Sequence, residues 1–319
     1  MQIAFLVNQV FSGWEPDDIR LGGTEESIVR WAEELAKRNH KVSVYRNGRN
    51  DNHIFKRREN GVWYYPREEY KGADVTINVK SSEIAPTGPT LYLTNETNAS
   101  SLDLSAYDGV IWPSHYAADH MEVNNPNIFI LPHGYDSEKI YMDRKVPKQC
   151  FYASSPDRGL DFLLAIWPQV YIRHPDATLI ITYGAHVSLP GVINLGECDE
   201  ETMNEVYRTS DLWLHPCSGG ELYCMTGKKA QVAGCIPVII PRMALEETVR
   251  SGYHAKNESE YLSLLLIVLD KPEEDRDLLR DDVMARADAV DWSQSTDMLE
   301  GIIRLIYNKA HIVQNETSN

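Results

Sequence analysis

The sequence lacks a long apolar run and a basic leader segment. No stretch reaches the roughly eighteen consecutive apolar residues of a membrane-spanning helix, and the opening MQIAFLVNQVF has no basic residue before its apolar run. We therefore expect neither a membrane span nor a secretory signal. Residues 3–7 instead fit a buried first strand, and no membrane-binding amphipathic helix stands out.

Positive charge is scarce as well. The 31 Lys and Arg residues stand against 47 Asp and Glu, which gives a formal net charge of −16 and a pI of about 5.0. A general attraction to nucleic acid or to an anionic membrane is therefore not expected. The local basic cluster at residues 56–58 is compatible either with a solvated face or with contact to an anionic acceptor.

Paired cysteines are missing too. The five cysteines, an odd number without a C-x-x-C pair, are Cys150, Cys198, Cys217, Cys224 and Cys235. Several lie in apolar patterns, so we expect reduced, buried thiols and a cytoplasmic, reducing compartment. Cys and His do not cluster at the short spacing of a zinc site, so no metal is expected.

The complete dinucleotide fingerprint G-x-G-x-x-G is also absent. In its place Gly22-Gly23 follows a strand and a long loop, and precedes a helix predicted to run to about Arg38 with Thr24 as its N-cap. The next strand, residues 42–45, completes a βαβ unit. Two glycines let the backbone approach an anion closely, but a plain scaffold turn fits the same pattern.

The first half of the chain continues with short apolar runs typical of parallel strands. They are residues 74–79, 90–93, 109–112 and 128–131. Before them, the turn signal Asn60-Gly61 and the apolar run 62–65 predict a hairpin. Ligands of such sheets bind beyond the carboxyl ends of the strands. The candidate contacts there are Asn95, Glu96, Thr97, Asn98, Ser114, His115, His133 and Gly134. Each is also compatible with a structural hydrogen bond.

The second half repeats the alternation of strand and helix after a polar connector at residues 133–149. We predict strands at 150–153, 177–182, 192–195, 212–216 and 236–240, and helices at about 158–173, 199–209 and 224–233. Glu221 lies in a glycine loop just before the last of these helices, where N–H groups and the helix dipole favour an anion. An ordinary αβ unit without a ligand explains this spacing equally well.

Four motifs follow one another along the chain: Gly22-Gly23, LPHGYD at 131–136, SSPDRGLDFLL at 154–164 and GGELYCMTGKKAQVAGCIPVI at 219–239. Together they resemble the retaining GT-B-fold glycosyltransferases, which include glycogen-synthase-like and sucrose-synthase-like enzymes. The resemblance implies an α/β protein with two Rossmann-like domains facing across a cleft. Residues 1–145 would form the acceptor-side domain, with 294–311 crossing back to it, and residues 146–293 the nucleotide-sugar domain.

The resemblance also implies roles for individual residues. Arg158 matches the basic position that neutralises the donor diphosphate, and Glu221 matches the first acid of a paired-glutamate motif beside the donor sugar. Both are catalytic candidates. The donor-binding candidates are Gly22, Gly23, Ser154, Ser155, Leu222, Tyr223, Cys224 and Lys229. Contacts to sugar or acceptor are expected from Asn95, Glu96, His115 and His133, and no metal or cofactor is expected beyond the nucleotide-sugar.

Two departures from the family pattern stand out. The second glutamate, eight positions after the first, would bind the ribose hydroxyls, but this position is Lys229, whose ammonium cannot accept a hydrogen bond. Ribose recognition must differ, or Lys229 contacts an anion. In the first domain, TNETN at residues 94–98 stands where a histidine often lies near the donor sugar, so that Asn95 and Glu96 take over contacts there.

We therefore expect a metal-independent retaining glycosyltransferase that uses a nucleotide-sugar, with UDP as the first choice of nucleotide. The acceptor is open: a glycan, a protein, a small molecule or, against the net charge, a modified nucleic acid. Two other classes remain. Lys229 is compatible with a nucleotide-sugar-binding protein that has lost turnover, and the α/β pattern with a Rossmann-type oxidoreductase, which the incomplete glycine fingerprint disfavours.

Overall fold

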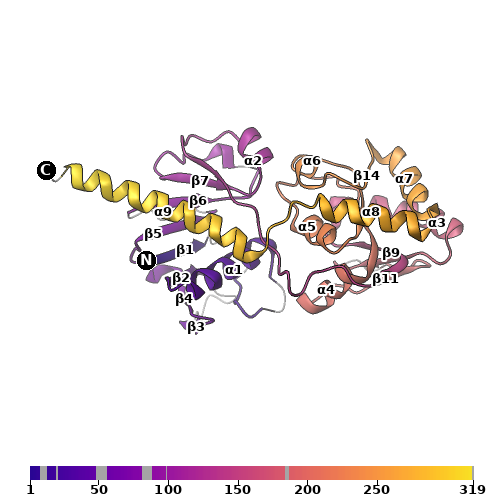
Figure 1. Ribbon diagram of the computed structural model, residues 1–319, viewed down its shortest axis with the longest axis horizontal. Helices are drawn as coiled ribbons and strands as arrows, with labels where there is room; N and C mark the ends of the chain where they lie inside the picture. Colours follow the sequence, from indigo (N-terminus) through magenta and orange to yellow (C-terminus); the bar gives the residue numbers. More distant parts are fainter. Residues whose placement is uncertain are drawn as a thin grey trace. The chain divides into compact units, whose positions relative to one another are not determined.

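The computed structural model describes residues 1–7, 13–18, 21–47, 56–80, 88–97, 99–183 and 187–317. The chain divides into two compact units (Figure 1): unit 1 comprises Met1–Gly134 and Val290–Asn319, and unit 2 comprises Tyr135–Ala289. Each unit contains a largely parallel sheet with helices, which confirms the predicted α/β class. No helix among the described residues has the length and apolar character needed to cross a membrane.

The described part of unit 1 contains an eight-stranded sheet in the order β3-β4-β2-β1-β5-β6-β7-β8. The strands are β1 (Gln2–Val7), β2 (Lys41–Arg46), β3 (Arg57–Glu59), β4 (Val62–Pro66), β5 (Val75–Val79), β6 (Thr90–Leu93), β7 (Gly109–Trp112) and β8 (Ile128–Ile130). Among these described strands, only β3 runs antiparallel to its neighbour. Asn60 and Gly61 both have positive φ, 46° and 86°, as the predicted hairpin requires.

Helix α1 (Gly23–Lys37) begins earlier than predicted. Its N-cap is Gly22, and no side chain forms a capping hydrogen bond. The expectation that Thr24 is the N-cap was wrong. Thr24 lies in the first turn, where its Oγ1 accepts a hydrogen bond from Asn95 Nδ2 at 3.3 Å. The hydroxyl therefore connects α1 to the chain that follows β6.

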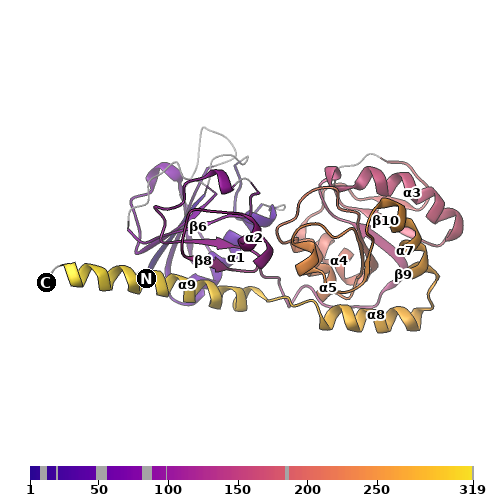
Figure 2. The same ribbon diagram turned by 90° about the horizontal axis from the view of Figure 1, so that it is seen from above.

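The last helix, α9 (Trp292–Thr317), packs against α1 within unit 1, as Figures 1 and 2 both show. Trp31 Nε1 donates a hydrogen bond of 2.8 Å to Ser295 Oγ, and the rings of Trp31 and Trp292 meet edge to face at 6.0 Å. The predicted return of the chain end to the first domain is confirmed. The other helices of unit 1 are α2 (His115–His120), η1 (Arg67–Glu69) and η2 (Ala99–Ser101).

The described part of unit 2 contains a six-stranded sheet in the order β11-β10-β9-β12-β13-β14, with parallel pairing throughout. The strands are β9 (Val146–Tyr152), β10 (Thr178–Ile181), β11 (Val192–Asn194), β12 (Ser210–His215), β13 (Ile236–Ile239) and β14 (Tyr253–His254). The helices are η3 (Pro156–Arg158), α3 (Leu160–Arg173), α4 (Glu200–Thr209), α5 (Met225–Val232), α6 (Leu245–Thr248), α7 (Glu258–Asp270) and α8 (Glu273–Ala285).

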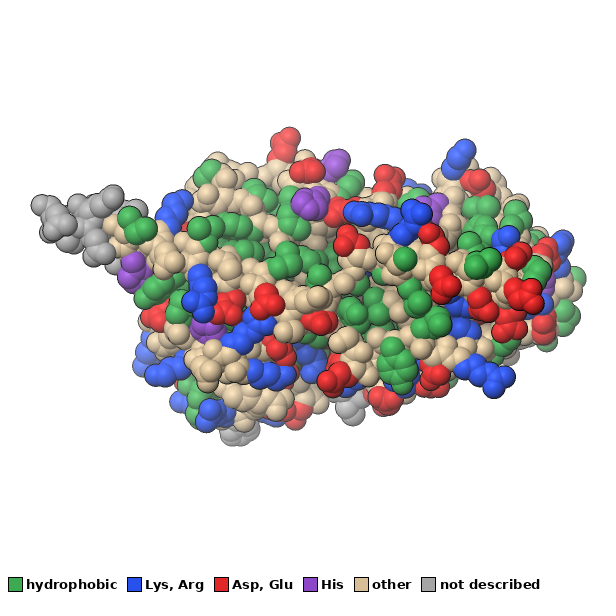
Figure 3. Space-filling view, in the orientation of Figure 1, with side chains coloured by type: hydrophobic (Ala, Val, Ile, Leu, Met, Phe, Trp, Pro, Cys, Tyr) green, Lys and Arg blue, Asp and Glu red, His purple; other side chains and the backbone are tan. Residues whose placement is uncertain are grey.

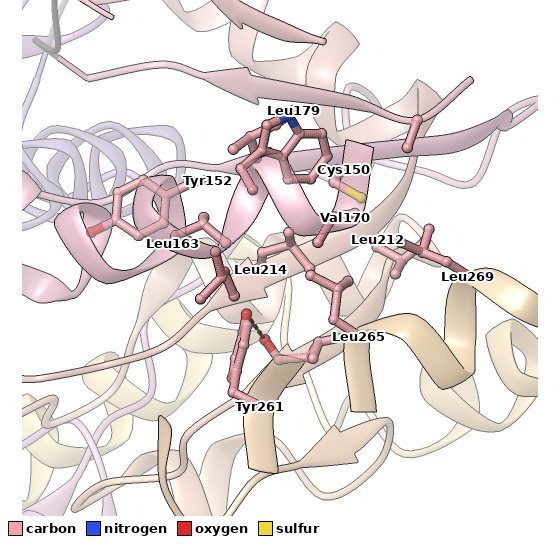
Figure 4. Close-up of a cluster of buried hydrophobic side chains, with 14 of the residues drawn as sticks. Cys150, Tyr152, Leu163, Val170, Leu179, Leu212, Leu214, Tyr261, Leu265 and Leu269 are labelled. Atoms are coloured by element: carbon pink, nitrogen blue, oxygen red, sulfur yellow. Dashed lines mark hydrogen bonds between the residues drawn. The ribbon is translucent and has the colours of Figure 1, made fainter. Parts of the chain in front are cut away.

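Alternate residues of these strands face two different cores, so helices cover both faces of the sheet. In β12, for example, Leu212 and Leu214 pack in one cluster with residues of α3 and α7, whereas Trp213 packs in the other with residues of α4 and α5. Figure 4 shows the first cluster, where the Tyr261 hydroxyl donates to the carbonyl of Val238 at 2.8 Å. The five cysteines, all in the described part of the chain, form no disulfide.

Lys228 of α5 attaches this helix to the last residues of unit 2. Its ammonium is buried and donates to the carbonyls of Ala287 at 2.6 Å and Asp288 at 3.2 Å. Burial lowers the pKa of Lys228 to about 8, against an opposing effect of the Asp288 carboxylate. Between this value and the ordinary 10.5, the unfolded chain binds more protons at this position than the folded protein does.

Lys228 should therefore make the free energy of unfolding increase with pH between about pH 8 and 10.5, by on the order of 2 kcal/mol. The variant Lys228→Met should lack this increase. Urea unfolding at both ends of this window measures the difference. Lys37→Met, which replaces an ammonium that is 66% exposed at the end of α1, is the control and should keep the wild-type slope. If the free energy of unfolding changed with pH in the same way in wild type and in Lys228→Met, the lowered pKa of Lys228 would be contradicted.

Candidate active site

Two loops of unit 2 lie side by side because the strands before them are parallel neighbours. The first loop, residues 153–159, follows β9, and the second, residues 216–224, follows β12. Both loops leave the carboxyl edge of the sheet. Ser218 Oγ donates to the carbonyl of Asp157 at 2.7 Å and so joins the two loops, and Thr226 Oγ1, in the first turn of α5, donates to that of Ala153 at 3.3 Å. The two predicted motifs therefore lie next to each other at this edge of the sheet.

Gly159 sets how closely these loops approach. Its φ of 102° lies in the left-handed region, and a Cβ added to it would lie 2.0 Å from the carbonyl oxygen of Pro216. Only glycine fits both conditions. The residue before it, Arg158, is thereby held against the second loop.

Arg158 and Glu221, the two catalytic candidates, form an ion pair across the two loops. The Glu221 side chain is 12% exposed and that of Arg158 is 33% exposed, so the pair is largely shielded from water. Burial opposes the charge of Arg158, but the hydrogen bond and charge of Glu221 outweigh it, and the net effect raises the pKa of Arg158. The backbone carbonyl of Glu221 is anchored by the Ala244 N–H at 2.9 Å.

His215 belongs to the same site, and the sequence analysis missed it. It ends β12, is buried, and has its Nε2 3.7 Å from Glu221 Oε1. Burial, followed by the charge of Arg158, lowers its pKa to about 3, so the imidazole is neutral. The ring stacks on Trp213 with centroids 5.3 Å apart. Its position at a strand end was the available signal, since the same criterion selected His115 and His133.

The start of α5 combines two buried side chains with a left-handed N-cap. Leu222 and Tyr223 bury their side chains, and Cys224 adopts φ 65° directly before the first helical residue. The first turn of α5 contains no acidic residue. No acid within the first turn offsets the positive end of the helix dipole, and the neighbouring Glu221 carboxylate is paired with Arg158. Lys229 lies half-buried in this helix, one residue after the buried Lys228.

The serines of the first loop have structural partners. The Ser155 hydroxyl bonds to the Asp157 carboxylate, and the Ser155 carbonyl accepts from the Tyr152 hydroxyl at 2.7 Å. Ser154 is half-buried beside it. These contacts shape the turn that leads into Arg158.

The remaining candidates lie in unit 1. Gly22 and Gly23 are exposed at the start of α1, and the Asn95 bond to Thr24 brings the end of β6 to this helix start. Unlike α5, α1 has acids in its first turn, and a Cβ on Gly22 would lie 2.4 Å from Glu25 Oε2. The α1 start is therefore less suited to an anion than the α5 start.

Lys80, which sequence reasoning missed, follows β5 at the same carboxyl edge with φ 55°. It is buried, and this burial lowers its pKa, while the charges of Glu96 and then Glu25 oppose the shift. Glu96 itself is half-buried after β6. Unit 1 thus places a cation and a carboxylate near the two glycines.

The two histidine candidates differ in their surroundings. His133 is buried, its Nδ1 lies 2.7 Å from Ser27 Oγ, and its ring stacks on Trp31 with centroids 5.5 Å apart. Packing between α1 and the chain after β8 accounts for these contacts. His115 is exposed as the first residue of α2.

No protein-family model matches the chain, and no curated protein does. Solved structures match nearly all of it. Sucrose-phosphate synthase from Thermosynechococcus elongatus matches with a TM-score of 0.73 at 13% identity, covering 97% of this chain and 100% of that chain. The chain has the GT-B fold. Anabaena HepE in complex with UDP and glucose matches with a TM-score of 0.68 at 12% identity, covering 95% and 99%.

A further GT-B match is the catalytic domain of starch synthase IV from Arabidopsis thaliana bound to ADP and acarbose. Its TM-score is 0.64 at 12% identity, and the match covers 96% of this chain and 99% of that chain. The predicted resemblance to GT-B glycosyltransferases is confirmed at the level of the fold. At such low identity, the activity must be argued from the residues of the site.

Gly159→Ala is expected to lower the free energy of unfolding by about 4 kcal/mol or more, because it adds a clash with the Pro216 carbonyl to the strain of a positive φ. Gly196→Ala is the matched control. Gly196 has φ 66° with no atom within 4 Å of an added Cβ, so only about 1 kcal/mol should be lost. Equal losses in urea unfolding would mean that the loops do not depend on this close approach.

Proposed function

We propose that the protein is a retaining glycosyltransferase that moves a sugar from a nucleotide-sugar to an acceptor hydroxyl. The observation that carries this proposal is the Arg158–Glu221 pair, held between two loops beside the acid-free start of α5. A cation, a run of N–H groups and a carboxylate are the groups that a diphosphate joined to a sugar requires. HepE with UDP and starch synthase IV with ADP share this fold, which supports the same ligand class.

In the proposed reaction, Arg158 exchanges its contact with Glu221 for the donor diphosphate. The guanidinium and the N–H groups of Leu222, Tyr223 and Cys224 then stabilise the charge that develops on the leaving phosphate. Glu221, released from Arg158, accepts hydrogen bonds from the hydroxyls of the donor sugar. Both changes favour cleavage of the bond between the sugar and the phosphate.

The chemistry we propose needs neither a protein nucleophile nor a metal. A phosphate oxygen of the leaving group takes the proton of the attacking hydroxyl, so the acceptor enters on the face from which the phosphate departs and the anomeric configuration is retained. Arg158 and the α5 dipole supply the positive charge at the diphosphate. Ser154 and Ser155 shape the loop around it.

The acceptor side is assigned to unit 1. Gly22 and Gly23 would approach the donor, while Asn95 and Glu96, together with His115, would contact the sugar or the acceptor. His133, whose ring stacks on Trp31, is a further candidate for this contact. A UDP-sugar is the first choice of donor, and Lys229 would meet an anionic group instead of ribose hydroxyls. The acceptor-side domain would comprise residues 1–145 with 294–311, and the donor domain residues 146–293.

A thermal-shift panel of UDP, ADP, their sugar conjugates and NAD tests the donor class, because a ligand that binds only the folded state raises the melting temperature. We expect a UDP-containing ligand to stabilise wild type and Arg173→Ala, but not Arg158→Ala. Arg173 is an exposed arginine at the far end of α3, paired with Asp270, and serves as the control. Stabilisation by NAD alone would favour an oxidoreductase instead.

Release of nucleoside diphosphate from the stabilising donor tests turnover. Glu221→Gln should lower this rate by about 10²–10³-fold, since the amide lacks the charge and half the acceptor capacity of the carboxylate. Stabilisation by the nucleoside diphosphate alone should persist in this variant. Binding without any turnover by the wild type, with or without acceptor sugars, would instead identify a nucleotide-sugar-binding protein.

A further inference from the structure

We propose that His215, Glu221 and Cys224 form a binding site for a thiophilic divalent cation such as Zn²⁺ or Co²⁺. The occupied site would inhibit the protein and is no part of the transfer reaction. The three residues contribute an imidazole nitrogen, a carboxylate oxygen and a sulfur, and these atoms all lie within 4.8 Å of one another. They are the three ligand types that zinc prefers.

The geometry lies close to that of a metal site. Ligands of a tetrahedral zinc ion bind at about 2.0–2.3 Å and thus lie roughly 3.5 Å from one another. His215 Nε2 and Glu221 Oε1 are already 3.7 Å apart. Contraction by about 1 Å around the third ligand would complete the arrangement, with water or a second carboxylate oxygen in the fourth position.

An independent observation comes from the hydrogen bonds of His215. Its side chain is 1% exposed, yet neither ring nitrogen has a hydrogen-bond partner among the described residues. A buried polar group without a partner is unfavourable and uncommon in folded proteins. The stack on Trp213 holds the ring with Nε2 on the side of Glu221, where a cation would satisfy it.

The scaffold holds the other two ligands as well. Cys224 caps α5 in a left-handed conformation, and its Sγ would lie 3.4 Å from a Cβ added to Gly227. The backbone carbonyl of Glu221 is bonded to the N–H of Ala244. The three side chains therefore project from anchored backbone at the end of β12 and the start of α5.

Charge limits which cations bind. A divalent cation with the Glu221 carboxylate and a Cys224 thiolate is neutral overall, and the thiol proton leaves to solvent. Arg158 adds a positive charge next to this group and competes for Glu221. Cations that rely on oxygen ligands, such as Mg²⁺ and Ca²⁺, gain nothing from the sulfur or the imidazole and are expected to bind poorly.

The inhibitory effect, unlike cation binding itself, rests on the proposed function. A cation that occupies Glu221 and Cys224 removes the sugar contact and obstructs the start of α5. Donor and cation would therefore exclude each other. Conversely, a bound diphosphate would draw Arg158 away from Glu221. It would still compete with the cation, because the two would overlap sterically.

Titration of the untagged, chelator-treated full chain with Co²⁺ tests the site, because a cobalt–thiolate bond gives an intense near-ultraviolet charge-transfer band. We expect this band at one equivalent in wild type and in Cys198→Ser, and its loss in Cys224→Ser. Cys198 is the matched control, a partly exposed thiol in a different loop. No band in wild type, or a band that persists in Cys224→Ser, would overturn the proposal.

Two further variants decide the matter if Cys224→Ser fails to fold. Glu221→Gln should weaken Co²⁺ binding at least tenfold, whereas Arg158→Ala should strengthen it by removing the competing charge. Unchanged affinities in both would overturn the proposal. Addition of UDP separates this inference from the function: a cobalt band that UDP does not diminish leaves the cation site intact and counts against the donor assignment alone.

Discussion

The close approach of two loops, at the point where Gly159 meets the Pro216 carbonyl, is the constraint on which the site depends. The parallel pairing of β9 and β12 brings the loops to one edge, but the distance between them is set by the absence of a Cβ at residue 159. This distance lets Arg158 reach Glu221. The pair in turn determines the electrostatic surroundings of His215.

The starts of α5 and α1 differ in their acidic residues. The α5 start has no acid in its first turn, whereas the α1 start carries Glu25 and Glu26. The α5 start, next to Arg158, is therefore the better suited of the two to the proposed diphosphate. On the face shown in Figure 3, acidic and basic side chains of the described residues are interspersed. This distribution fits attraction of an anionic ligand by a local site better than attraction by the whole surface.

The elements that could be predicted are those with strong local patterns. The continuous burial of β12, the Asn60-Gly61 turn and the amphipathic last helix each follow from patterns of residues close in sequence. The start of α1 could not be placed in this way. Thr24 has the chemistry of a cap, but its hydroxyl is used by Asn95, which lies far away in the sequence, and Gly22 takes the cap position.

The same distinction applies to the site. The sequence by itself determined the α/β architecture, because apolar strands and glycine-rich turns are local features. Its resemblance to GT-B glycosyltransferases singled out Arg158 and Glu221. Only the tertiary structure decided that these two side chains pair, that buried His215 adjoins them, and that His133 packs on Trp31. Such relations depend on distances between segments remote in the chain, and no local pattern encodes those distances.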